Sequence, residues 1–107
     1  MSRLAHLITA ICAFAAFSAF AQDASSKDTL YTKSLAATCA NCHGTNGKAV
    51  QGSAVVTLAG MPADYIVAQM KAFKAGTRTA TIMHQISKGY SDAQIVQVAA
   101  YFATQKK

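Results

Sequence analysis

The chain has 107 residues, of which 10 are Lys or Arg and 4 are Asp or Glu, so it carries a net charge of +6. This length is too short for a multidomain enzyme and predicts one small basic domain. Leu, Ile, Val and Phe together make up 15 of the 86 residues from Gln22 to Lys107, a share below the roughly 20% expected of a self-sufficient globular core. A small domain of this kind usually needs disulfides, a metal or a cofactor for stability.

The first 21 residues are typical of an export signal. Met1–His6 carries positive charge, and the 14-residue stretch Leu7–Phe20 is apolar. Small residues at Ala19 and Ala21 predict cleavage before Gln22. An uncleaved membrane anchor is the alternative, but the apolar stretch is short for a bilayer span.

Cys12 lies within the apolar stretch and is expected to leave with the signal. We therefore predict a signal peptide at Met1–Ala21 and an exported, periplasmic domain at Gln22–Lys107. Only Cys39 and Cys42 then remain in an oxidising compartment, so their surroundings decide what these cysteines do.

A helix is predicted from about Lys27 to Ala40, because Ser25 and Asp28 form a helix start signal. It ends in Cys39-Ala40-Asn41-Cys42-His43, the C-x-x-C-H signature of covalent haem attachment. Positions i, i+3 and i+4 share one face of a helical turn, so both thiols can reach a haem while the His43 imidazole points at the iron. The motif predicts one covalent haem c, which would also complete the small core.

Two other uses of the cysteines are less consistent with the sequence. A thioredoxin-like redox pair also has the C-x-x-C spacing, but it needs a βαβ setting that this chain lacks. A zinc site would combine Cys39, Cys42 and His84, yet the adjacent Cys42 and His43 cannot easily share one tetrahedral ion.

A long connection follows the motif and is expected to drape over the haem. Pro62 and Gly76 are start and stop signals for a second helix. Its predicted buried stripe consists of Ile66, Met70 and Phe73.

A short turn is predicted at His84–Lys88, and Ser91 and Gln94 then form a capping box that starts the last helix. One face of that helix is apolar, with residues at i, i+3, i+4 and i+7: Ile95, Val98, Ala99 and Phe102. No segment alternates with the period of a strand. We therefore predict an all-α fold, with three main helices and a short one around one haem.

A six-coordinate haem needs a second axial ligand opposite His43. The candidates are Met61, Met70, Met83 and His84, with lysines less plausible. Met70 falls on the apolar stripe of a helix, where a methionine is usually part of the core. Met83 lies in a loop 40 residues after His43, which lets the chain wrap around the haem, so its position is favoured over Met61 and His84.

The chain resembles class I c-type cytochromes, and within them the cytochrome subunit of flavocytochrome c sulfide dehydrogenase. The resemblance covers essentially all of the predicted mature chain. Beyond C-x-x-C-H, it rests on four stretches: Leu58–Ile66, Phe73–Arg78, Ala80–Met83 and Lys88–Asp92. It implies a class I cytochrome c fold, thioether bonds at Cys39 and Cys42, His43 as proximal ligand and Met83 as distal ligand. It also implies that Tyr101 packs near Leu35.

Filled axial positions imply electron transfer rather than catalysis. By resemblance, the electron donor is an FAD-containing sulfide dehydrogenase subunit. The alternatives are a freestanding electron carrier and a haem-based gas binder or weak peroxidase. A basic surface is predicted from Lys71, Lys74, Arg78 and Lys88, with Lys48 in a flanking loop. We expect it to attract an acidic redox partner. The alternative is an ordinary solvated helix face. Dispersed charge on an exported chain argues against nucleic acid as a partner.

Overall fold

The computed structural model describes residues 25–107. The predicted signal peptide at Met1–Ala21, its cleavage site and Cys12 therefore lie outside the described residues. The chain divides into two units, residues 1–31 and residues 32–107. Of the first unit, the structure describes residues 25–31, which are helical. The fold and the site below belong to the second unit.

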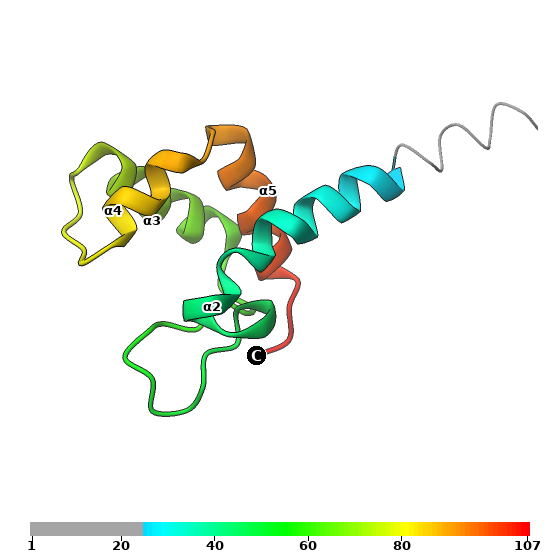
Figure 1. The fold of residues 1–107 in the computed structure, drawn as a ribbon, viewed down its shortest axis with the longest axis horizontal. Coiled ribbons are helices and arrows are strands. Elements are labelled where there is room, and N and C mark those ends of the chain that lie inside the picture. Colours follow the sequence, from blue (N-terminus) through cyan, green and yellow to red (C-terminus); the bar gives the residue numbers. More distant parts are fainter. Residues whose placement is uncertain (1–24) are drawn as a thin grey trace, which may run out of the picture. The chain divides into compact units, whose positions relative to one another are not determined.

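The described residues contain helices joined by turns and irregular loops and no strand, so the all-α prediction is confirmed. No helix among them combines the length and apolar character needed to cross a membrane. In chain order, a helix at 25–37 is followed by α2 (Ala40–His43), a 3-10 turn η1 (Thr45–Gly47), α3 (Ala63–Ala75), α4 (Met83–Ile86), a second 3-10 turn η2 (Ser87–Gly89) and α5 (Asp92–Ala103) (Figure 1).

The haem-attachment motif lies on its own short helix, because the preceding helix ends at 37 rather than at the predicted Ala40. The hydroxyl of Thr38 donates to the Leu35 carbonyl over 2.7 Å. Thr38 N–H also donates to Leu35, and Cys39 N–H to Ala36, in a tightened last turn. Side chains of this type compete with the helical ladder. Cys39 thereby becomes the N-cap of α2.

The two longer helices begin and end at the predicted signal residues, except that the start of one differs by one position. Pro62 is the N-cap of α3 rather than its first helical residue, and Gly76 ends this helix in the left-handed conformation. The Ser91 hydroxyl accepts from Gln94 N–H, while the Gln94 side chain accepts from Ser91 N–H. These two bonds are the predicted capping box at the start of α5.

Helices α3 and α5 pack against each other and form the core (Figure 1). The four predicted apolar positions of α5 are all buried, as is Ile66 of α3. Met70 and Phe73 are only half-buried. Three of the seven buried hydrophobic residues of the described chain are alanines, which confirms that the core is small: Ala36, Ala59, Ile66, Ile95, Val98, Ala99 and Phe102.

Gly47 lies at a point where the loop after the motif crosses the end of α5. It is buried and has a φ of +76°, and a Cβ there would come within 2.7 Å of the Phe102 ring and 2.9 Å of Leu58 Cβ. We expect Gly47→Ala to lower the free energy of unfolding by about 2–4 kcal/mol, from left-handed backbone strain and overpacking. Guanidinium unfolding of the native protein measures this.

Gly52→Ala is the matched control, because Gly52 has a φ of +84° but no atom within 4 Å of a built Cβ. Only the backbone cost, about 1 kcal/mol, should remain there. Equal losses for the two variants would show that the contact with Phe102 does not matter.

Candidate haem site

Two thiols and an imidazole come together on one turn of α2. Cys39 caps the helix, and its carbonyl accepts from His43 N–H over 2.9 Å. Gly44 ends the helix with a φ of +80°, and a Cβ there would lie 2.0 Å from the Lys48 carbonyl oxygen. A glycine is therefore required directly after His43, because the chain turns back sharply on itself.

The His43 ring is oriented by a backbone carbonyl from the following loop. Its Nδ1 lies 2.8 Å from the Val56 carbonyl oxygen. A carbonyl only accepts, so Nδ1 carries the proton and Nε2 keeps its lone pair for a metal. Sequence reasoning could not identify which carbonyl orients the ring, because any residue type supplies a backbone carbonyl.

Cys39 and Cys42 form no disulfide bond within the described residues. Burial raises the pKa of the Cys39 thiol above its ordinary value, and this outweighs the opposing hydrogen bond with Thr38. Cys42 is exposed. In the part of the chain that the structure describes, no three His, Cys, Asp or Glu side chains gather as metal ligands. The alternative zinc site of Cys39, Cys42 and His84 is therefore not formed, and a thioredoxin-like βαβ setting is not found among residues 25–107.

The candidates for the second axial ligand differ in their surroundings. Met61 and Met70 pack against the core cluster around Phe102. The prediction that Met83 lies in a loop is wrong, because Met83 and His84 begin α4, where both are half-buried. One ring nitrogen of His84, Nδ1, is buried without a hydrogen-bond partner among the described residues. Met61 and Met70 thus have a packing role in the described core, and Met83 as the second axial ligand stays a prediction.

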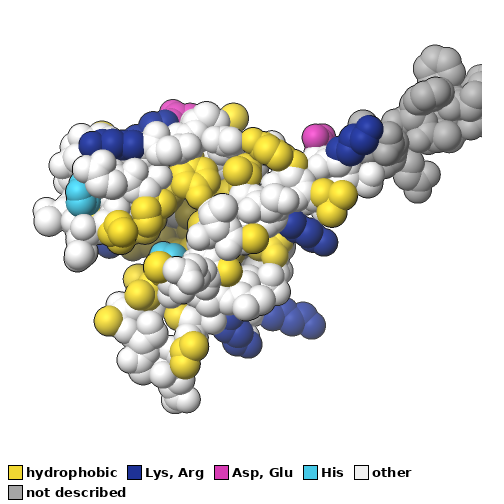
Figure 2. All heavy atoms as spheres, viewed as in Figure 1, with side chains coloured by type: hydrophobic (Ala, Val, Ile, Leu, Met, Phe, Trp, Pro, Cys, Tyr) yellow, Lys and Arg dark blue, Asp and Glu magenta, His cyan; other side chains and the backbone are white. Residues whose placement is uncertain are grey.

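Apolar side chains surround the space next to the motif. Figure 2 shows hydrophobic side chains gathered around a hollow between the α3–α4 part and the part that carries α2. The second unit also has several exposed large apolar residues: Val50, Val55, Val56, Tyr65, Ile82, Ile86 and Val96. Two cysteines without a disulfide, an imidazole nitrogen and apolar walls suit a flat macrocycle that carries an iron ion.

The cytochrome c family matches residues 29–106. The chain belongs to the cytochrome c family. This cytochrome's cofactor is therefore covalently bound haem c, and Cys39 and Cys42 have the spacing of the haem-binding motif. The class I c-type cytochrome identified by resemblance is confirmed. The family's role is electron transfer.

Similar proteins are bacterial cytochromes. This cytochrome is 37% identical over 73 residues to the cytochrome subunit of sulfide dehydrogenase from Chlorobaculum tepidum, covering 68% of this chain and 64% of the relative. It is 34% identical over 71 residues to a thiosulfate dehydrogenase electron acceptor from Thiomonas intermedia, covering 66% of this chain and 33% of the relative. It is 38% identical over 74 residues to cytochrome c-554(548) from Halomonas halodenitrificans, covering 64% of this chain and 86% of the relative.

Most residues of the predicted basic surface make side-chain contacts with other residues of the cytochrome. Lys74 Nζ donates to the Tyr90 carbonyl over 2.7 Å and to Asp92 Oδ1 over 3.0 Å. Lys71 Nζ lies 3.8 Å from Asp92 Oδ2. Arg78 stacks over the Phe73 ring at 4.7 Å and also donates to Gln69. Of the four predicted residues, only Lys88 makes no ion pair or hydrogen bond through its side chain within the described chain.

A second unexpected contact joins the haem motif to the segment after α4. The hydroxyls of Tyr90 and Thr38 lie 2.5 Å apart. The Thr38 hydroxyl already donates its proton to the Leu35 carbonyl, so the Tyr90 hydroxyl donates to the Thr38 oxygen. No sequence signal indicates this pair, because the two residues are 52 positions apart. It holds the start of the motif and the region following Met83 together.

The Lys74 contacts make the stability of this cytochrome depend on pH. The hydrogen bond from Lys74, and then its charge, hold the pKa of Asp92 below its ordinary value. A lowered folded-state pKa contributes stability above the unfolded pKa, and this is lost as pH falls through the folded pKa. We expect Lys74→Met to destabilise the protein at pH 7, and the difference from wild type to shrink below about pH 4.

Denaturant unfolding at several pH values measures this difference. Lys71→Met is the control, because its nitrogen lies 3.8 Å from the carboxylate and should show a smaller pH-dependent effect. A difference for Lys74→Met that stays constant down to pH 3 would contradict a role for the ion pair.

Proposed function

We propose that this cytochrome is a periplasmic electron carrier whose haem c is held by thioethers from Cys39 and Cys42 and by His43 and Met83 as axial ligands. The proposal includes the Gln22–Lys107 domain as the mature exported protein. The observation that carries it is the His43 ring: Nδ1 is bonded to the Val56 carbonyl, which leaves Nε2 for iron, on the same helical turn as two cysteines that form no disulfide.

Each residue has a separate task. Cys39 and Cys42 fix the position of the porphyrin through two covalent bonds, and Val56 fixes the His43 tautomer and ring orientation. Met83 offers a soft neutral sulfur, which favours ferrous iron relative to a second imidazole. The bound haem supplies reversible one-electron chemistry at its iron. With both axial ligands supplied by the chain, no position is left for a substrate, so we infer a carrier rather than an enzyme.

The similarity to a sulfide dehydrogenase cytochrome subunit supports an FAD-containing sulfide dehydrogenase subunit as the electron donor. The second candidate is a freestanding carrier. It is favoured by the match to cytochrome c-554(548), a relative that is named as a cytochrome and not as a dehydrogenase subunit.

Purification of the native protein from the periplasm separates these candidates. Co-purification with a flavoprotein, and haem reduction by sulfide only in its presence, supports the subunit. Reduction by several unrelated donors without a bound flavoprotein supports the freestanding carrier. A purified protein without haem would contradict both.

Electrostatic attraction of an acidic partner makes a separate prediction. We expect the rate of haem reduction by the partner to fall at least about tenfold from low to high ionic strength, as steered encounters do. Stopped-flow reduction across a salt series measures it. A rate that does not change with salt would remove the steering role of the basic residues.

A further inference from the structure

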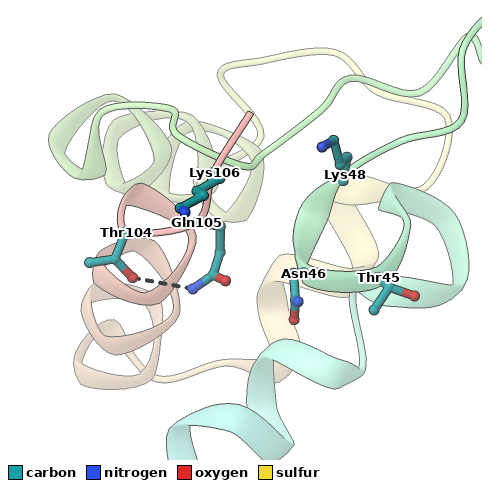
Figure 3. A pocket seen from close by; sticks show the side chains of 6 residues that line it. All are labelled: Thr45, Asn46, Lys48, Thr104, Gln105 and Lys106. Carbon is teal, nitrogen blue, oxygen red and sulfur yellow. Dashed lines mark hydrogen bonds between the residues drawn. The ribbon is translucent and has the colours of Figure 1, made fainter.

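A polar depression lies between the turn after the haem motif and the chain end after α5. One pocket of about 450 Å³ is lined by Thr45, Asn46, Lys48, Thr104, Gln105 and Lys106. The two sets of side chains come from opposite sides of it (Figure 3). A second pocket of about 270 Å³ shares Thr45 and Asn46 and includes Lys33. The two pockets therefore adjoin, and together they are called the basic depression.

Tyr101 holds both walls of the basic depression in place. Its hydroxyl donates to Asn46 Oδ1 over 2.7 Å. On the other wall, its carbonyl accepts from the Gln105 side chain over 2.9 Å and from the Thr104 hydroxyl over 2.8 Å. The walls are thus fixed by side-chain contacts before any ligand binds, which lowers the entropy cost of binding.

The free polar groups in the basic depression are mostly donors. Asn46 uses its oxygen for Tyr101, so its amide N–H₂ remains available. Lys33, Lys48 and Lys106 make no ion pair within the described chain, and no acidic residue lines either pocket. By contrast, Lys71 and Lys74 share Asp92. Three lysines without an ion pair therefore line this depression, whereas the two lysines of α3 share one aspartate.

We propose that the basic depression is a docking surface for a protein partner that presents carboxylate side chains. Three lysines and an amide in the lining match two or more carboxylates, and the two adjoining pockets give room for more than one side chain. Ala40 of the motif lines the second pocket, so a partner docked there lies beside the haem motif. The proposal rests on the proposed function only in taking the partner to be a redox protein.

A fluorescein-labelled hexaglutamate peptide tests this surface on the haem-loaded, reduced protein at low salt. We expect the peptide to bind, and Lys48→Gln with Lys106→Gln to weaken binding at least fivefold. The matched control, Lys71→Gln with Lys88→Gln, removes the same charge from the other surface and should change binding less than twofold. Tyr101→Phe, which frees Asn46, should weaken binding by a smaller factor than the lysine pair.

Amide NMR of the reduced protein locates the contact, with peptide-induced shifts expected at Thr45, Asn46 and Thr104. Equal weakening by both lysine pairs would show non-specific charge attraction and overturn the proposal. No peptide binding would also overturn it, as would inorganic phosphate giving the same shifts while the peptide does not, which would mark a small-anion site. Binding is measured without electron transfer, so its failure leaves the proposed carrier function intact.

Discussion

Replacing Cys39 and Cys42 together by alanine should yield a chain without a cooperative unfolding transition. The described core has only four buried hydrophobic residues larger than alanine, Ile66, Ile95, Val98 and Phe102. Several other large apolar side chains of the second unit are exposed. Burial contributes about 25 cal/mol per Å² of apolar surface, so this small core does not offset the conformational entropy of the chain without a covalently held macrocycle.

Thermal scans by far-ultraviolet circular dichroism and calorimetry measure this outcome. The single variants Cys39→Ala and Cys42→Ala are the controls, because each keeps one thioether and should keep a transition at a lower temperature. Truncating an exposed cysteine such as Cys42 removes little packing. A cooperative transition in the double variant would show that the polypeptide folds without attached haem.

Met83→Ala is expected to convert this closed carrier into a protein that binds carbon monoxide rapidly in the reduced form. Loss of the thioether opens one axial position, and the methionine–iron charge-transfer band of the oxidised form should disappear. The reduction potential should fall by on the order of a few tenths of a volt, a part of the ~0.8 V range that axial ligands cover.

The other candidates provide the controls. Met61→Leu and Met70→Leu should leave the band in place, because both side chains pack against the core. His84→Ala tests the neighbour of Met83, whose Nδ1 is buried without a partner within the described residues. If the charge-transfer band survived Met83→Ala, or if only His84→Ala opened the iron to carbon monoxide, Met83 would not be the ligand.

The double cysteine variant and Met83→Ala test two different roles of the haem. The cysteine pair tests whether haem completes the core, and Met83 tests whether the iron is closed to ligands. A gas binder or weak peroxidase would bind carbon monoxide rapidly without any substitution. The wild-type protein is expected to resist it, as a carrier does.

Local features of this cytochrome could be predicted from its sequence. The capping box at Ser91 and the apolar face of α5 depend on residues three or four positions apart, so composition and spacing are sufficient. The same holds for the C-x-x-C-H motif, whose residues share one turn. The end of the first helix was predicted less well, because the Thr38 hydroxyl turns back to Leu35 and stops the helix early.

The sequence by itself thus determined the helical class, the covalent cofactor and the weakness of the core, since these follow from local spacing and composition. Only the tertiary structure decided that Val56 orients His43, that Tyr90 reaches Thr38, that Asp92 takes up Lys74, and that Tyr101 shapes a basic depression. These partners lie 13 to 55 residues apart. Contacts between such distant residues depend on the course of the whole chain. The Val56 contact is also made by a backbone carbonyl, which every residue type has, so the sequence carries no signal for it.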